Sequence, residues 1–335
     1  MPATTKVTIA VLGAGSWGTA LAVLLARNGH RTLLWGHDAA HVALLRQARC
    51  NATFLPDVAF PDNLELHADI PTLARAAQHF LVVVPSHAFR VLLKSLQPHL
   101  PVGAMVAWAT KGVDADSGTL FSQVADNILG TSCPSGIVSG PTFAKEVAQG
   151  LPTAITVASA RLDVAEVIAQ WLRNDRVRVY TSLDRVGVEL GGAVKNIMAI
   201  ATGICDGLGY GANARAALIT RGLAEMQRLG AAMGGKPETF MGLAGLGDLV
   251  LTCTDNQSRN RQIGLALGKG RPLHLALADL GQVAEGVATA RTVLALARRW
   301  RVDMPITEQV ARVLFEGLPP QAAVEALLGR EPRAE

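Results

Sequence analysis

The sequence predicts an α/β protein with two domains: a doubly wound, mostly parallel N-terminal domain and an all-α C-terminal domain. Three observations support this. Short apolar runs alternate with helical patterns in the first half, a glycine motif follows the first run, and only helical spacing appears after about Val186. We place the two domains at residues 1–188 and 189–335.

The strands of the first domain are predicted from runs that are apolar almost throughout. They are VTIAVLG (7–13), RTLLWG (31–36), HFLVVVPS (79–86), AMVAWATKG (104–112), SGIVSGP (135–141) and TAITVAS (153–159). Continuous apolar strands are typical of a parallel sheet covered by helices on both faces. The segment DRVRVYTSLD (175–184) alternates instead and predicts an edge strand. An Ala/Leu-rich segment, 19–30, is expected to form the first covering helix.

The second domain is predicted to be helical. Its helical patterns cover 188–204, 214–233, 258–268, 289–300 and 306–318. Pro305 suits the first turn of the last of these helices, and Gly317 suits its end.

Composition limits the classes of function. Of the 335 residues, 50% are hydrophobic and 17% are charged, which excludes disorder. The net charge of +4 is dispersed, so we expect no nucleic-acid surface, although the excess favours an anionic metabolite. A long uncharged run, 127–144, is interrupted by prolines and glycines, so we expect no membrane span. The apolar opening leads directly into a glycine motif, and no signal peptide is expected.

The four cysteines are far apart in the sequence and form no C-x-x-C pair: Cys50, Cys133, Cys205 and Cys253. We therefore expect neither a disulfide framework nor a metal site, and a cytoplasmic location.

The stretch GAGSWG supplies Gly13, Gly15 and Gly18 between a predicted strand and a predicted helix. In this context the G-x-G-x-x-G pattern indicates a Rossmann-type dinucleotide site, with the pyrophosphate at the helix N-terminus. The alternative is a glycine-rich turn without a ligand. After the second strand, His37 suits a 2′-phosphate and Asp38 suits a free 2′-hydroxyl, so both NAD and NADP remain open. The alternative is that both residues are solvated in the loop.

Lys195 lies among small and apolar residues in the stretch ELGGAVKNIMAIATGI. A buried ammonium needs compensation, and an active site with an anionic substrate would provide it. Lys111 directly follows a predicted strand. In open α/β sheets, ligands bind at the carboxyl ends of the strands. A surface lysine in a turn is the alternative for Lys111.

Two further segments carry candidate binding residues. SGPTFAKEV places Gly140 at a strand end ahead of a helix, which suits either a ligand or an ordinary connection. The stretch 242–264 joins a glycine-rich turn with Asp248 to Ser258, Arg259 and Asn260 at a helix start. Helix N–H groups, a guanidinium and an amide together suit a phosphate. The alternatives are a capping role for Ser258, a solvated Arg259 and a local turn bond for Asp248.

Together these segments resemble the bacterial-type NAD(P)-dependent glycerol-3-phosphate dehydrogenases. The matching stretches are GAGSWGTALA, LWGHD, VVPSHAFR, TKGV, SGPTFAKEV, ELGGAVKNIMAIATGI, GLAGLGDLVLTCT, SRNRQIG and VAEGVAT, from residue 11 to about 289. The resemblance implies interconversion of dihydroxyacetone phosphate and sn-glycerol 3-phosphate with NAD or NADP. It also implies a role in supplying the backbone of glycerophospholipids.

The resemblance also implies residue roles. Lys195 would be the proton donor and acceptor, with Lys111 and Asp248 as further catalytic residues. The implied cofactor-binding residues are Gly13, Gly15, Ser16, Trp17, Gly18, His37, Lys111, Ala144, Arg259, Val283 and Glu285. The implied substrate-binding residues are Lys111, Gly140, Thr142, Lys195, Asp248, Ser258, Arg259 and Asn260. His37 stands where many relatives have arginine, which leaves the preference for NADP open.

Two rival functions are considered. A two-domain dehydrogenase acting on a β-hydroxy acid or a ketoacid would share the glycine motif and a lysine in the helical domain, but its substrate would end in a carboxylate. A non-catalytic nucleotide sensor would keep the fold and is expected to lose Lys195 or Asp248, yet both are present. A homodimer is expected because helical second domains often pair.

Overall fold

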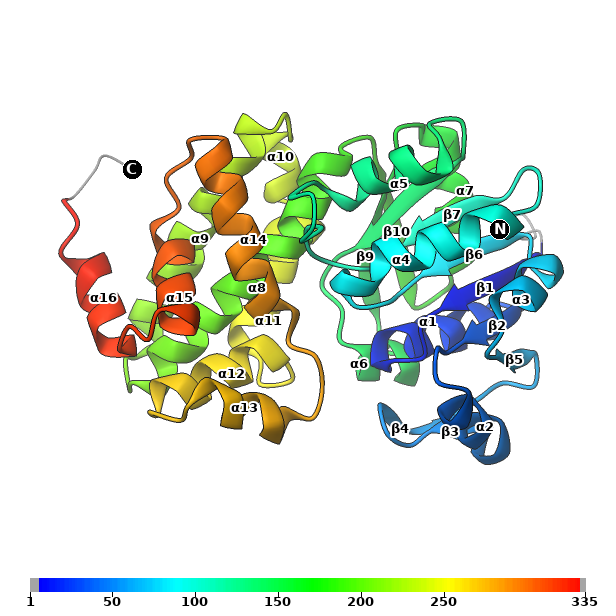
Figure 1. The fold of residues 1–335 in the computed structure, drawn as a ribbon, viewed down its shortest axis with the longest axis horizontal. Coiled ribbons are helices and arrows are strands. Elements are labelled where there is room, and N and C mark those ends of the chain that lie inside the picture. Colours follow the sequence, from blue (N-terminus) through cyan, green and yellow to red (C-terminus); the bar gives the residue numbers. More distant parts are fainter. Residues whose placement is uncertain (1–5, 332–335) are drawn as a thin grey trace. The chain divides into compact units, whose positions relative to one another are not determined.

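The computed structural model describes residues 6–331, which form two compact units (Figure 1). One unit runs to Thr110 and continues through Phe121–Arg185. The other contains Lys111–Leu120 and the chain from Val186 onward. Lys111 therefore belongs to the helical unit, although it follows a strand of the first unit closely.

The first unit contains an eight-stranded sheet in the order β10-β9-β8-β7-β6-β1-β2-β5. Its strands are β1 (Thr8–Leu12), β2 (Arg31–Trp35), β5 (Leu64–His67), β6 (His79–Val82), β7 (Met105–Trp108), β8 (Ser135–Ser139), β9 (Thr153–Ala158) and β10 (Val177–Ser182). Neighbouring strands are parallel except β8 and β9, which are antiparallel. The predicted mostly parallel α/β architecture is confirmed, and β10 lies at an edge as its alternating pattern predicts.

The sequence patterns missed three short strands: β5 and the antiparallel pair β3 (Cys50–Asn51) and β4 (Leu55–Ala59). The β3–β4 hairpin lies outside the main sheet. Strand β4 contains Pro56, which lacks a backbone donor, and Asp57 at φ 66°, so neither residue favours a regular strand.

Helices cover the sheet of the first unit. They are α1 (Ser16–Arg27), α2 (Ala39–Ala48), α3 (Ile70–Ala76), α4 (Ser86–Leu96), the 3₁₀ turn η1 (Gln97–His99), α5 (Phe121–Leu129), α6 (Ala144–Gln149) and α7 (Leu162–Leu172).

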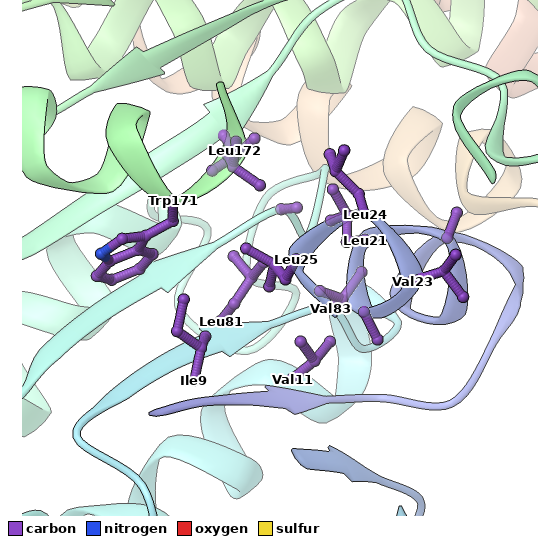
Figure 2. Close-up of a cluster of buried hydrophobic side chains, with 14 of the residues drawn as sticks. Ile9, Val11, Leu21, Val23, Leu24, Leu25, Leu81, Val83, Trp171 and Leu172 are labelled. Atoms are coloured by element: carbon purple, nitrogen blue, oxygen red, sulfur yellow. The ribbon is translucent and has the colours of Figure 1, made fainter. Parts of the chain in front are cut away.

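Figure 2 shows the core under α1, where Leu21 and Leu25 face Ile9 and Val11 of β1 and Leu81 of β6. All five side chains are fully buried. Full burial of a leucine or isoleucine side chain stabilises a fold by about 1.5–3 kcal/mol. This contact fixes α1, and with it the glycine turn at its start, on the carboxyl end of β1.

Every regular element among the described residues of the second unit is a helix or a helical turn, while its segment Lys111–Leu120 forms neither a helix nor a strand. The unit contains α8 (Arg185–Gly207), α9 (Ala212–Ala232), α10 (Pro237–Phe240), the π-helical turn η2 (Leu243–Gly247), α11 (Asp248–Thr254), α12 (Arg259–Gly268), α13 (Leu273–Leu280), α14 (Glu285–Arg299), α15 (Pro305–Phe315) and α16 (Pro320–Leu328). Pro305 begins α15, and Gly317 follows its end at φ 70°, both as expected.

Helix α8 forms the core of this unit. Among the described residues, α8 alone is long and apolar enough to cross a membrane, but 94% of its apolar stretch is buried inside the protein. A buried core helix satisfies the same criterion, so this is weak evidence for a span. The backbones of α8 and α12 are in close contact, because a Cβ on Gly203 of α8 would lie 2.3 Å from the carbonyl oxygen of Arg261 on α12.

Candidate active site

The turn between β1 and α1 has the geometry that a dinucleotide pyrophosphate requires. Gly13 adopts φ 130°, and a Cβ there would lie 2.2 Å from the carbonyl oxygen of Val83. A Cβ on Gly18 would lie 1.8 Å from the carbonyl oxygen of Gly13, so this residue permits the close packing of helix and strand. A Cβ on Gly15 would meet nothing within 4 Å. Open space at Gly15 lets a phosphate approach the backbone closely.

The start of α1 also offers donors to such a group. Gly15 caps the helix without a side-chain hydrogen bond, which leaves the first helical N–H groups facing outward with the positive end of the helix dipole. Ser16 is the first helical residue. The indole nitrogen of Trp17 is buried and has no hydrogen-bond partner within residues 6–331. These features fit the phosphates and polar edges of a dinucleotide.

The loop after β2 contains His37 and Asp38, the residues considered for contact with a 2′-phosphate or a 2′-hydroxyl. His37 is exposed. Asp38 is the N-cap of α2, and its Oδ1 accepts hydrogen bonds from the backbone N–H groups of Ala40 at 2.9 Å and His41 at 3.3 Å. Asp38 is therefore the N-cap of α2, and one of its two carboxylate oxygens is engaged in capping.

The connection after β8 places three further residues implied by the resemblance. Gly140 adopts φ 140°, a conformation that glycine tolerates and other residues rarely adopt. The hydroxyl of Thr142 donates to the carbonyl oxygen of Gly140 at 3.2 Å. Ala144 is the first residue of α6.

In the helical unit, Lys195, Asp248 and Lys111 meet. The Nζ of Lys195 lies 2.6 Å from Oδ1 of Asp248, and the Nζ of Lys111 lies 2.7 Å from Oδ2 of the same carboxylate. Lys195 also donates to the hydroxyl of Thr252 at 2.9 Å. Asp248 is fully buried, and the side chain of Lys195 is 8% exposed.

This geometry answers how Lys195 is tolerated in an apolar helix. Asp248 is fully buried between the two amines, and the partly buried Lys111 pairs with it, so neither a local turn bond for Asp248 nor a solvated surface turn for Lys111 describes the structure. Asp248 does not lie in a loose turn: it begins α11, directly after the π-helical turn η2.

The cluster sets the proton affinity of Lys195. Burial lowers the pKa of Lys195 from its ordinary value to about 8, with Lys111 acting in the same direction and the Asp248 carboxylate opposing them. Removal from water therefore outweighs the attraction of the carboxylate. A lysine with a pKa near 8 exchanges protons readily in the physiological range.

The segment Ser258–Asn260 begins α12. Ser258 is its N-cap, and its Oγ accepts from the N–H of Arg261 at 3.3 Å, so the capping alternative is correct. The serine hydroxyl keeps its own hydrogen for another acceptor. Arg259 is exposed and makes a long hydrogen bond, 3.3 Å, to Gln282.

Asn260 ties this segment to its neighbours. Its amide nitrogen donates to Oδ1 of Asn196 at 3.0 Å, and its Oδ1 accepts from the N–H of Gly286 at 2.9 Å. The start of α12 is thus linked to α8 one residue after Lys195. It is also linked to the start of α14, where Glu285 lies; Val283 precedes that helix and is 45% exposed.

Arg261 connects the helices beneath these groups. Its Nε donates to the carbonyl oxygen of Cys253 at 3.1 Å, and its Nη2 lies 2.5 Å from Oδ2 of Asp206. Asp206 also pairs with Arg215 of α9 at 2.8 Å. Arg261 therefore joins α12 to α11 and α8, the helices that carry Asp248 and Lys195.

Sequence reasoning missed Thr252, Asn196 and Arg261. For Thr252 the available signal was its position four residues after Asp248, which places both side chains on one helix face. Asn196 is adjacent to Lys195, and Arg261 directly follows the proposed phosphate segment, but neither has a pattern that identifies its partner.

Comparison with known proteins identifies the family. Family models for the N-terminus and the C-terminus of NAD-dependent glycerol-3-phosphate dehydrogenase match residues 8–165 and 184–325. The chain belongs to this family. The predicted resemblance is therefore confirmed.

The family's individual members are similar over nearly the whole chain. A glycerol-3-phosphate dehydrogenase [NAD(P)+] of Aeromonas hydrophila is 57% identical over 331 residues, 98% of this chain and 99% of the relative. One of Edwardsiella ictaluri is 56% identical over 328 residues, covering 98% and 97%. The crystal structure of a glycerol-3-phosphate dehydrogenase from Coxiella burnetii is 48% identical, with a TM-score of 0.94 over 97% of this chain and 99% of that one.

Proposed function

We propose that the protein interconverts dihydroxyacetone phosphate and sn-glycerol 3-phosphate with NAD or NADP. Membership of the dehydrogenase family supports the reaction class, and the cluster of Lys195, Asp248 and Lys111 supports the chemistry. The observation that carries the proposal is the buried Lys195 amine, held by a fully buried carboxylate at 2.6 Å. Within this proposal the first domain, 1–188, binds the dinucleotide, and the second, 189–335, binds the substrate.

The residues divide the chemistry among them. The nicotinamide supplies or accepts the hydride when it is bound. In ketone reduction, the substrate oxygen gains negative charge, and the ammonium of Lys195 stabilises that charge and donates its proton. In alcohol oxidation, the neutral amine of Lys195 takes the hydroxyl proton. Asp248 and Thr252 hold the amine in position, and Lys111 adds a second positive charge.

The phosphate end of the substrate is assigned to the start of α12. Arg259 is an exposed guanidinium at a helix N-terminus, where free N–H groups add to its attraction for a dianion. Ser258 and Asn260 would complete this subsite, with Gly140 and Thr142 as further substrate-binding residues. The binding energy of the phosphate orients the reacting carbon without taking part in the chemistry.

The proposed cofactor-binding residues are those at the β1–α1 turn with His37, Lys111, Ala144, Arg259, Val283 and Glu285. The glycine turn supports a dinucleotide there, as does the buried indole nitrogen of Trp17, which has no hydrogen-bond partner in the described part of the chain. We further propose a cytoplasmic enzyme, acting as a homodimer, whose product is the backbone of glycerophospholipids.

The test is oxidation of NADH and of NADPH, followed side by side, with dihydroxyacetone phosphate as substrate and ketopantoate as comparison. We expect turnover with the first substrate and none with the second. Turnover of ketopantoate alone, or binding of NADH without turnover, would contradict the proposal. The Lys195→Ala substitution should lower kcat by a much larger factor than it raises KM. Arg259→Ala should chiefly raise KM for dihydroxyacetone phosphate.

A further inference from the structure

The side chain of Asn51 reaches the dinucleotide turn from outside the main sheet. Asn51 is the last residue of β3, in the hairpin that the eight-stranded sheet excludes, and it is fully buried. Its amide nitrogen donates to the carbonyl oxygen of Ala14 at 3.0 Å and to the hydroxyl of Thr19 at 2.8 Å. Its Oδ1 accepts from the N–H of Phe54 at 3.2 Å. Both amide hydrogens and the carbonyl oxygen of this side chain are thus engaged.

Ala14 stands between the first two glycines of G-x-G-x-x-G, so this hydrogen bond fixes a peptide group of the turn itself. In a planar trans peptide the C=O of one residue and the N–H of the next point in opposite directions. When Asn51 holds the Ala14 oxygen on the protein side, the N–H of Gly15 must point away from it. Within residues 6–331 that N–H donates no hydrogen bond to another backbone group.

The other carbonyl groups of the turn are also directed inward. The Gly13 oxygen packs against Gly18, and the Gly15 oxygen accepts from the N–H of Thr19 at 2.9 Å. Asn51 therefore completes an arrangement in which oxygens face the protein and N–H groups face outward. Without its amide, the Ala14 oxygen would lack a partner, and the peptide between Ala14 and Gly15 would be free to rotate its oxygen toward the ligand side.

We propose that Asn51 is a positioning residue for the pyrophosphate of the dinucleotide, acting through the peptide group between Ala14 and Gly15. The inference rests on the proposed use of NAD(P). It gives the β3–β4 hairpin a function. The hairpin lies outside the main sheet and brings the amide nitrogen of Asn51 to the carbonyl oxygen of Ala14 in the glycine turn. Loss of the donor turns an oxygen toward a dianion and weakens dinucleotide binding without altering the substrate site.

The test measures binding of ADP-ribose, which retains the pyrophosphate but lacks the nicotinamide, by titration calorimetry of the ligand-free protein at pH 8. Two variants remove the donor: Asn51→Ala, and Asn51→Asp, which keeps the shape and the acceptor for Phe54. Asn63→Ala is the matched control. Its amide nitrogen also donates to two carbonyl oxygens, those of Ala26 and His30, each at 2.8 Å, but at the opposite end of α1.

We expect both Asn51 variants to raise the Kd of ADP-ribose about tenfold or more, equivalent to about 1.4 kcal/mol. Asn63→Ala should lower the melting temperature but leave this Kd unchanged. With NADH at saturation, KM for dihydroxyacetone phosphate should stay near the wild-type value in the Asn51 variants. If the alanine variant does not fold, the aspartate variant provides the same comparison.

Two results would overturn the inference: a wild-type Kd in the Asn51 variants, or an equal loss of affinity in Asn63→Ala. Failure of the proposed function gives a different result, because the wild-type protein would then not turn over dihydroxyacetone phosphate. Wild-type turnover together with unaffected Asn51 variants would contradict the role of Asn51 alone.

Discussion

Replacing Gly264 with alanine tests whether the packing of α8 on α12 sets the distance between Lys195, the proposed proton-transferring residue, and the proposed phosphate subsite. A Cβ at Gly264 would lie 2.2 Å from the carbonyl oxygen of Ile200 and 2.9 Å from the Cα of Gly203. Ordinary contacts of a Cβ are 3.4–4 Å, so the two backbones must separate by about 1 Å.

The energetic consequence follows from two opposing effects. Overpacking in a rigid core costs about 1–3 kcal/mol and occasionally more; because only backbone can move at Gly264, we take about 2–4 kcal/mol here. Alanine recovers about 1 kcal/mol because glycine is unfavourable inside a helix. We expect a net loss of about 1–3 kcal/mol in unfolding free energy. Because the proposed phosphate subsite lies at the start of α12 and α8 carries Lys195, KM for dihydroxyacetone phosphate should rise several-fold.

Gly222→Ala is the matched control. Gly222 also lies inside a helix, α9, but its Cβ would meet the sulfur of Met198 at 2.6 Å, and a flexible methionine side chain can move away. Urea unfolding should give a near-neutral change for Gly222→Ala, and steady-state assays should give an unchanged KM. Equal losses in the two variants, or wild-type stability of Gly264→Ala, would refute this reasoning.

Two other buried groups lead to predictions. Arg261→Lys keeps the charge but cannot reach both Cys253 O and Asp206, so we expect a loss of about 1–3 kcal/mol in urea unfolding. We also expect a rise in KM for dihydroxyacetone phosphate. Arg215→Lys alters the partly exposed partner of the same Asp206 and should lower the unfolding free energy less. A larger loss of unfolding free energy in Arg215→Lys than in Arg261→Lys would contradict the role assigned to Arg261. Glu225 is buried on α9 and accepts from the N–H groups of Ile306 and Thr307 at the start of α15, and burial raises its pKa to about 7. Between the ordinary carboxyl pKa and about 7, the folded state binds more protons at Glu225 than the unfolded state, so this contribution to stability is lost as pH rises through the window. The difference in unfolding free energy between wild type and Glu225→Gln, measured from pH 5 to 8, should therefore change with pH, and a constant difference would contradict the raised pKa.

The sequence predicts most of the fold because its strands are strongly patterned. Strands β1, β6 and β7 are apolar on both faces, which identifies a parallel sheet without knowledge of pairing. The antiparallel direction of β9 could not be predicted, since its side-chain pattern is the same in either direction. Strand β4 was missed because its Pro56 and the positive φ of Asp57 contradict strand signals.

In the candidate site, features formed by neighbouring residues in the sequence could be predicted, whereas contacts between distant residues could not be predicted from sequence patterns. The glycine turn was predictable, because a strand, a turn and a helix follow one another in the sequence. Lys195 was noticeable as a charge among apolar residues, but its partner Asp248 lies 53 residues away and was inferred from family resemblance. Asn51 contacts a carbonyl oxygen 37 residues away, and a buried asparagine carries no pattern that reveals its partner.

The central claim is that the buried amine of Lys195 transfers the proton. The most direct measurement is kcat/KM for oxidation of glycerol 3-phosphate from pH 6.5 to 9.5, which reports ionisation of the free enzyme. The substrate phosphate, with a pKa near 6, is a dianion across most of this range. With the neutral amine as the proposed acceptor, the account predicts activity that rises with pH through an apparent pKa near 8, the value to which burial lowers the pKa of Lys195. A flat profile in the wild-type protein, or near-normal turnover in Lys195→Ala, would contradict it.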